Sequence, residues 1–127
     1  MIDQDLIAYV AGLGTPAASR VHLGNAPQDT LYPFVVIRRT GGSTPQTLGG
    51  VSLFARAQFS INVIAKEYAD AYPTANAIHQ SLHGYRGTMG ATEVQSARSL
   101  SEPSDGSEID GDKVTRWLTQ DVLIVHR

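Results

Sequence analysis

The segment from Arg56 to Lys66 alternates between apolar and polar side chains, and only Ile64 breaks the pattern. Successive side chains of a strand point to opposite faces of a sheet, so this period of two predicts a strand. One face of it is expected in the core, and the other is expected to be solvated or covered by something else. The expected core face carries Ala57, Phe59, Ile61, Val63 and Ala65, and the opposite face carries Arg56, Gln58, Ser60, Asn62 and Lys66.

Helical and strand patterns surround this segment on both sides. Apolar residues at helical spacing predict an amphipathic helix over about 3–13, which Gly14 ends. A second helix is expected from an N-cap at Asp70, with Pro73 in its first turn and Gly84 as its end. Apolar runs predict four further strands, at about 20–23, 34–37, 93–100 and 114–126.

These elements predict an α+β fold with the order α-β-β-β-α-β-β. We expect a largely antiparallel or mixed sheet of four to five strands, with the two helices on one face. The chain has 127 residues, which fits one domain spanning residues 1–127.

Two connections between consecutive strands are long: 41–54 is rich in Gly, and 101–113 is rich in Ser, Asp, Glu and Gly. Loops longer than about 12 residues are uncommon in compact domains and are usually functional or disordered. We expect both to project as long hairpin arms. Leu48, Val51 and Phe54 are candidate interface residues on the first arm. Alternatively, the apolar residues near its end simply begin the next strand.

Composition excludes several classes of function. The net charge of -2 and the pI of about 6.0 argue against binding nucleic acid through phosphate neutralisation, which needs clustered Lys and Arg. The chain has no Cys, which excludes zinc-thiolate sites and thiol chemistry. No apolar run approaches the roughly 18 residues of a membrane span, and the basic start of a signal peptide is missing. We therefore expect no membrane partner, and we expect the protein to be made and assembled in the cytoplasm.

Each apparent chemical site fails on spacing or context. His79 and His83 are spaced like a metal-binding pair, but Gln80 follows where a zinc protease needs Glu. The acidic stretch after residue 101 lacks the register of a calcium loop, because Ile109 occupies a ligand position. Gly12-Leu13-Gly14 follows a helix rather than a strand, unlike a dinucleotide loop. We therefore predict no enzyme, no catalytic, metal or cofactor-binding residues, and no cofactor.

Taken in order, several segments resemble the tail-completion, or tail-terminator, family of long-tailed bacteriophages and gene transfer particles. The match runs from the N-terminal helix to the last residue. Leu31–Val36 matches the proline-led strand of the family, and Arg56–Ala65 matches its central strand. Tyr68–Ala71 matches the start of its helix, and Leu82–Thr88 matches the Gly-rich end of that helix. Asp121 matches an acid in its last strand. Pro73 inside the helix departs from the family pattern.

The resemblance implies a ring, usually hexameric, at the head-proximal end of the tail in the virion. Such a ring stops tail-tube polymerisation and joins tail to head. Its implied partners are other copies of the chain, the tail-tube protein and a head-side connector or stopper, while DNA passes through the lumen without specific binding. The remaining candidate interface residues are Tyr85 and Arg86, with acids expected in an arm near the lumen or the tube-facing rim: Glu102, Asp105, Glu108, Asp110 and Asp112.

Two other classes of function stay open at this point. One is a different neck component, such as a head-completion or stopper protein, which shares the structural role but not the partner. The other is a small-ligand binding domain or enzyme, which needs a convergent polar pocket that the sequence does not show.

Overall fold

The computed structural model describes residues 2–17, 20–27, 31–43, 46–47, 50–51, 55–100, 102–110 and 113–127. Its elements follow the chain in the order α1 (Ile2–Ala11), β1 (Val21–Leu23), β2 (Phe34–Ser43), β3 (Gln46–Thr47), β4 (Gly50–Val51), β5 (Ala55–Ala65), α2 (Tyr68–Leu82), β6 (Gly87–Met89), β7 (Thr92–Ser99), β8 (Ser104–Asp110) and β9 (Lys113–His126).

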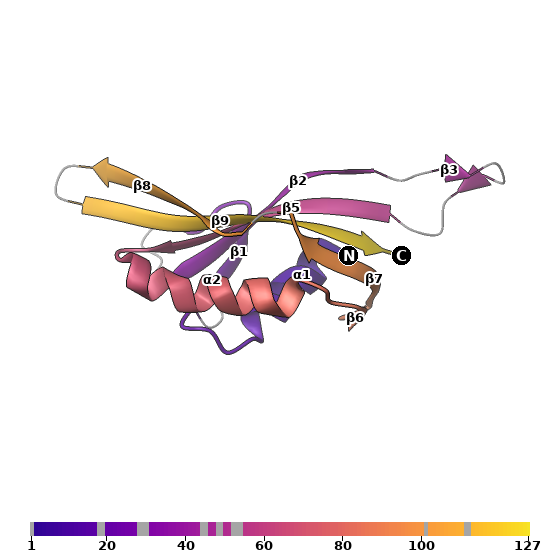
Figure 1. The fold of residues 1–127 in the computed structure, drawn as a ribbon, viewed down its shortest axis with the longest axis horizontal. Helices are drawn as coiled ribbons and strands as arrows, with labels where there is room; N and C mark the ends of the chain where they lie inside the picture. Colours follow the sequence, from indigo (N-terminus) through magenta and orange to yellow (C-terminus); the bar gives the residue numbers. More distant parts are fainter. Residues whose placement is uncertain are drawn as a thin grey trace.

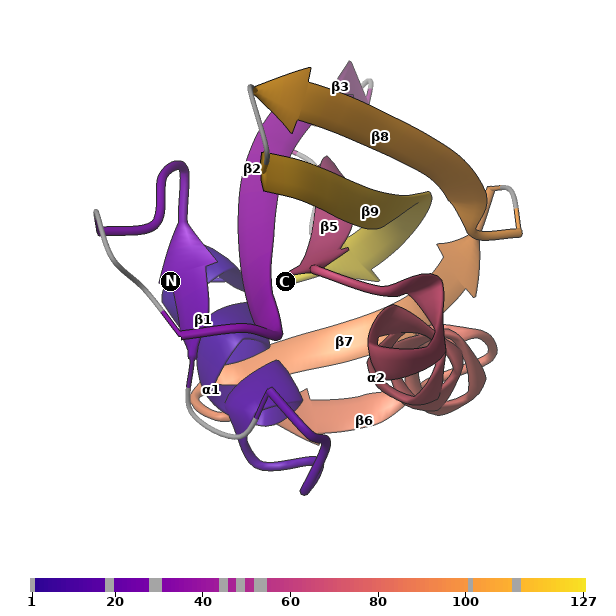
Figure 2. The ribbon, with the colours of Figure 1, turned by 90° about the vertical axis from the view of Figure 1, so that its left-hand side faces the viewer.

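Seven strands form one sheet in the order β1-β2-β5-β9-β7-β6, and β8 also pairs with β9. The sheet is mixed, because β1 and β2 are parallel while the other pairs are antiparallel. β9 is the central strand. β5 pairs with one of its edges, and β8 and β7 share the other, at Lys113–Thr119 and Val122–His126 respectively. Seen along its long axis, the sheet is strongly curled (Figure 2).

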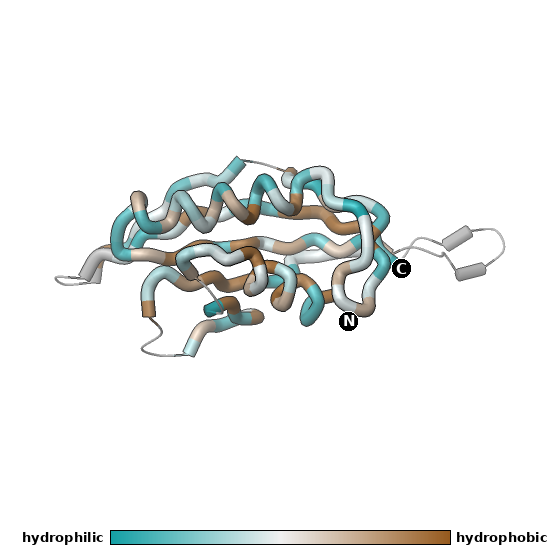
Figure 3. The backbone as a smooth tube through the Cα atoms, turned by 90° about the horizontal axis from the view of Figure 1, so that it is seen from below, coloured by the Kyte–Doolittle hydropathy of each residue, from teal (hydrophilic) through white to brown (hydrophobic). Residues whose placement is uncertain are grey.

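The core lies between the sheet and the two helices, which occupy the same side of it (Figure 1). The face of β5 that alternation predicted to be buried is fully buried, with Phe59 and Ile61 among its largest side chains. Leu118 and Val122 of β9 extend this core. Seen from the helix side, hydrophobic residues run through the central strands, and α2 carries hydrophilic residues along its length (Figure 3).

The helices pack on different strands. α1 contacts β1 and β6 through a stripe that includes Leu6 and Val10, whereas α2 contacts β5, β7 and β9 through Ile78 and Leu82. α2 begins at Tyr68, so Asp70 lies in its first turn rather than at its N-cap.

α2 also differs from expectation at Pro73, which lies inside the helix, beyond its first turn. A proline there removes one backbone donor. Its side chain is exposed, near the start of the helix, where the ring displaces no core residue. The helix ends where Gly84 takes a φ of 84°, a left-handed conformation that favours glycine.

The α+β class, the mixed sheet and the shared side of the helices are confirmed, but the expected strand number and order are wrong. The expected loop at 101–113 contains β8, and every residue of β8 pairs with one of β9. Its Ser, Asp, Glu and Gly residues have low strand propensity, so the partner strand, not local sequence, imposes the extended conformation. The short strand β6 was also missed, in the Gly-rich segment that follows the expected helix end at Gly84.

The first expected arm is partly strand as well. β2 continues to Ser43, and β3 and β4 form a separate two-stranded hairpin. Val51 belongs to β4, whereas Leu48 and Phe54 lie outside the described residues. β5 begins at Ala55, and the apolar residues that the alternative assigned to this strand lie outside the described residues.

Candidate interaction surface

The helices leave the other side of the sheet uncovered, and we call this side of β2, β5, β9 and β8 the open face (Figure 1). Strand register fixes which residues share it, because directly opposed residues point the same way. Three rows cross it: Phe34–Ile64–Trp117–Gly106, then Val36–Asn62–Thr119–Ser104, then Arg38–Ser60–Asp121.

The first row is apolar. Trp117 packs over Gly106, since a Cβ on that glycine would overlap the indole ring. At the other end of the row, Tyr32 packs against Phe34 with ring centroids 5.5 Å apart, and its side chain is 40% exposed. Hence a half-exposed strip of aromatic side chains and Ile64 runs across four strands and is available to a partner.

The middle of the open face is held by side-chain hydrogen bonds. Thr119 Oγ1 donates to Asn62 Oδ1 over 2.7 Å, and Asn62 Nδ2 donates to Ser60 Oγ over 3.4 Å. These bonds fix the orientation of the Asn62 amide. Polar groups so ordered need little reorganisation when another surface covers them.

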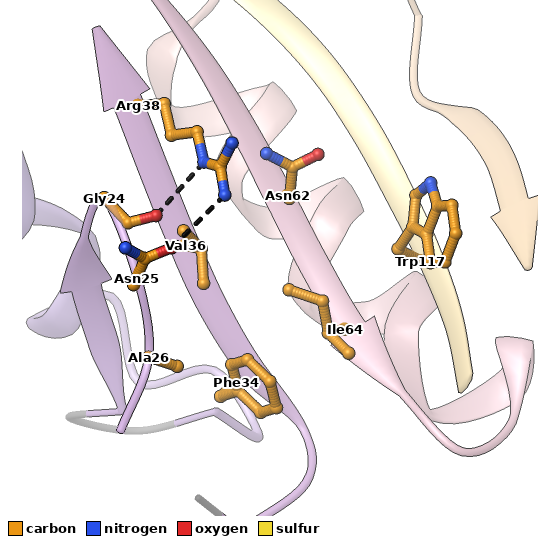
Figure 4. Close-up of a pocket in the computed structure, with 9 residues that line it drawn as sticks. All are labelled: Gly24, Asn25, Ala26, Phe34, Val36, Arg38, Asn62, Ile64 and Trp117. Atoms are coloured by element: carbon orange, nitrogen blue, oxygen red, sulfur yellow. Dashed lines mark hydrogen bonds between the residues drawn. The ribbon is translucent and has the colours of Figure 1, made fainter. Parts of the chain in front are cut away.

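A groove of about 530 Å³ lies between the first two rows and the segment that follows β1 (Figure 4). Phe34, Val36 and Ile64 give it an apolar floor. Arg38 borders it and holds the neighbouring segment, donating from Nε to Gly24 O over 3.1 Å and from Nη2 to Asn25 Oδ1 over 3.4 Å. The groove is therefore apolar inside, with a cation at its border.

Most of the candidate acids lie on or beside β8. Glu102, Asp105 and Glu108 are exposed, Asp110 is the last residue of β8, and Asp112 lies outside the described residues. Five of the twelve acidic residues, and none of the ten basic ones, lie between 102 and 112. Ile109 lies on the same strand and is 72% exposed.

Tyr85 and Arg86 lie elsewhere, at the end of α2. Tyr85 is half-buried against Tyr9, with ring centroids 5.0 Å apart, and its hydroxyl donates to Thr88 O over 3.0 Å. Arg86 is exposed beside it. The structure therefore does not bring these two candidates together with the acids of β8.

The described residues show an ordered His pair but no metal-binding cluster, since no three His, Asp or Glu side chains among them could hold one ion. The rings of His79 and His83 are stacked with centroids 5.6 Å apart. Ser99 engages both: its N–H donates to Nδ1 of His83, and its hydroxyl lies 3.0 Å from Nδ1 of His79. The pair therefore ties α2 to the end of β7.

Two groups on α1 have shifted pKa values. A hydrogen bond from Thr92 is the main cause that lowers the pKa of Asp5, whereas burial, aided by Tyr85, raises the pKa of Tyr9. Asp5 contacts β7 through Thr92, whereas Tyr9 donates to Ser81 O of α2 and packs against Tyr85.

The sequence missed the open face as a candidate site. Phe34, Ile64 and Trp117 are 30 and 53 positions apart along the chain, and only strand register brings them into one row. One signal pointed to it: Ile64 is the apolar residue that interrupts the polar side of the alternating segment.

Comparison with protein families places almost the whole chain in one of them: the family described as tail completion protein gp17 matches residues 3–127. Among solved structures, a chain of the virion of a native gene transfer agent particle has a TM-score of 0.60 and 18% sequence identity. That match covers 98% of this chain and 90% of the other, so the two share a fold. No curated protein sequence matches. In the part of the chain that the structure describes, no helix is long and apolar enough to cross a membrane.

Proposed function

Since this chain belongs to the family of tail completion protein gp17, a structural component of the virion tail, we propose that it forms a ring at the head-proximal end of the tail. The ring ends polymerisation of the tail tube and joins the tail to the head. The subunit number we propose is six. The role is structural, and it requires no catalytic step and no cofactor.

The observation that carries this proposal is the placement of different surfaces at different ends of one elongated subunit. The tip of β8 and β9 projects at one end, and the β3–β4 hairpin projects at the other (Figure 1). A cyclic ring needs two unlike patches on each subunit, so that the first patch of one copy meets the second patch of the next. A subunit with unlike projecting ends meets that requirement.

Free strand edges support the same proposal. Among the residues that the structure describes, β1 and β8 pair with the sheet along one edge each, so their other edges can accept a further strand. Pairing an exposed edge with a strand of a neighbouring subunit satisfies its backbone groups. We propose that the arm at 41–54 makes such contacts, with Leu48, Val51 and Phe54 at the interface. We also propose that Tyr85 and Arg86 contact the tail tube or the head-side stopper.

Imaging of the purified protein by negative stain, with light scattering for mass, tests the ring directly. Rings of about six subunits, alone or capping purified tail tubes, are expected. A protein that stays monomeric both in solution and on tube ends would contradict the proposal.

Co-purification separates this role from that of another neck component. A tail-completing ring should co-purify with tail tubes that lack heads. Co-purification with tailless heads instead would favour the head-completion or stopper alternative.

A further inference from the structure

We propose that the open face of one subunit receives the β8–β9 hairpin of the next, with Ile109 seated in the groove. This rests on the proposed ring and names the contact that builds it. The hairpin is the first patch, defined as 104–110 with the start of β9, and the open face is the second.

Shape and hydrophobicity match between the two patches. Ile109 is the most exposed large apolar side chain on the described surface, at 72%, and it stands on a narrow two-stranded hairpin. The groove on the open face has an apolar floor and about 530 Å³ of space. Moving an exposed Ile side chain out of water is favourable, so this single insertion suits an anchor residue.

Charge also matches. Exposed Arg38 and Arg56 lie on the open face by register, and exposed Arg98 lies on its continuation onto β7. Asp121 on the same side of β9 is half-buried, whereas exposed Glu108 lies on this side of β8, within the hairpin itself. The hairpin, taken as residues 102–113, carries five acids and one base, Lys113, which leaves the rest of the chain with a formal charge of +2. Two copies therefore attract when the hairpin of one approaches the open face of the other, whereas two hairpins repel.

The hairpin cannot fill the groove of its own subunit, so Ile109 can enter such a groove only in another copy of the chain. Gly106 lies opposite Trp117 on the open face, so Ile109, three positions further along the strand, points to the other side of the sheet. Pairing with β9 fixes that orientation. The acids are thus expected between subunits, rather than at the lumen or tube-facing rim that the loop interpretation suggested.

Cysteine cross-linking tests this contact without background, since the natural chain has no Cys. Ala26→Cys lies in the groove and Ile109→Cys at the hairpin. The two single variants are mixed under assembly conditions and oxidised. A covalent dimer that contains one chain of each kind is expected, and each variant alone should give none.

The matched control is Asn76→Cys, at an exposed position on α2 and therefore on the helix side. If rings form but Ile109→Cys cross-links to Asn76→Cys in the same yield as to Ala26→Cys, this contact is overturned while the ring itself stands. Absence of any assembled species, on tubes or in solution, would overturn both.

Charge reversal provides a second test that does not depend on cross-linking. Asp105 lies on the same side of β8 as Ile109 and is exposed. Arg38→Glu and Asp105→Arg are each expected to weaken subunit association at least about tenfold, the effect of losing a charge pair across an interface. Combining both in one chain should restore association. Failure of the double variant to recover, with both singles folded by circular dichroism, would count against the pairing.

Discussion

At the scale of single residues, the open face depends on Gly106, whose lack of a side chain makes room for Trp117. Gly106 leaves the space that the Trp117 indole occupies, and Trp117 in turn forms one wall of the groove. Tyr68 fixes the same residue from another direction, because its hydroxyl donates to Gly106 O over 3.1 Å. One glycine therefore positions an aromatic wall, a strand and the start of α2.

Gly106→Ala is predicted to displace the indole and to lower the free energy of unfolding by about 1–3 kcal/mol, the usual cost of overpacking. Urea unfolding followed by fluorescence measures this, and Trp117, the single Trp of the chain, reports directly on the site. Gly41→Ala is the matched control in β2, because a Cβ there meets nothing within 4 Å. Equal losses in both variants would argue against the packing.

The Asp5–Thr92 hydrogen bond predicts a pH-dependent difference between natural chain and Thr92→Val. Thr92 holds the pKa of Asp5 below its ordinary value of 3.8, so the bond stabilises the fold fully above that pH. As the pH falls below 3.8 and through the folded pKa, the contribution is lost. The two unfolding free energies should therefore differ at pH 7 and converge in acid; a constant difference across this range would contradict the assignment.

At the scale of elements, what the sequence predicts depends on whether a segment determines its own conformation. β5 and the body of α2 were predicted because their apolar periodicity is local and strong. β8 was not predicted, because its polar residues are typical of a loop and adopt an extended conformation only through pairing with β9. The open face was missed for the same reason: pairing assembles it from residues that are remote in the chain.

The end of α2 offers a prediction at this scale. Gly84 takes a φ of 84°, and a Cβ there would meet nothing within 4 Å, so the cost of Gly84→Ala is conformational alone. We expect a loss of about 1–2 kcal/mol of unfolding free energy, the penalty of a left-handed residue with a side chain. Thermal or urea unfolding measures it. An unchanged stability would mean that the helix can end in another way.

At the scale of the whole molecule, stability and assembly reside in different parts. The core lies between the helices and the middle of the sheet, whereas β3 and β4 pair only with each other among the described strands. A hairpin outside the core contributes little to folding. Its position at one end of the subunit suits contact with a neighbour instead (Figure 1).

Removal of residues 46–51 is therefore predicted to leave the unfolding free energy nearly unchanged and to abolish ring formation on tail tubes. Circular dichroism with urea measures the first, and electron microscopy of tube ends measures the second. A variant that still forms rings would show that this hairpin is dispensable for the contact.

The central position of β9 bears on when a newly made subunit can assemble with others. β5 precedes this strand by some fifty residues, yet β5, β7 and β8 all pair with it, and it supplies Trp117, Thr119 and Asp121 to the open face. A nascent chain that has not yet emerged beyond residue 113 has neither a closed sheet nor a complete groove. If the open face forms the proposed contact, chains that lack β9 lack the surface needed for it, and we predict that they are not incorporated into a ring.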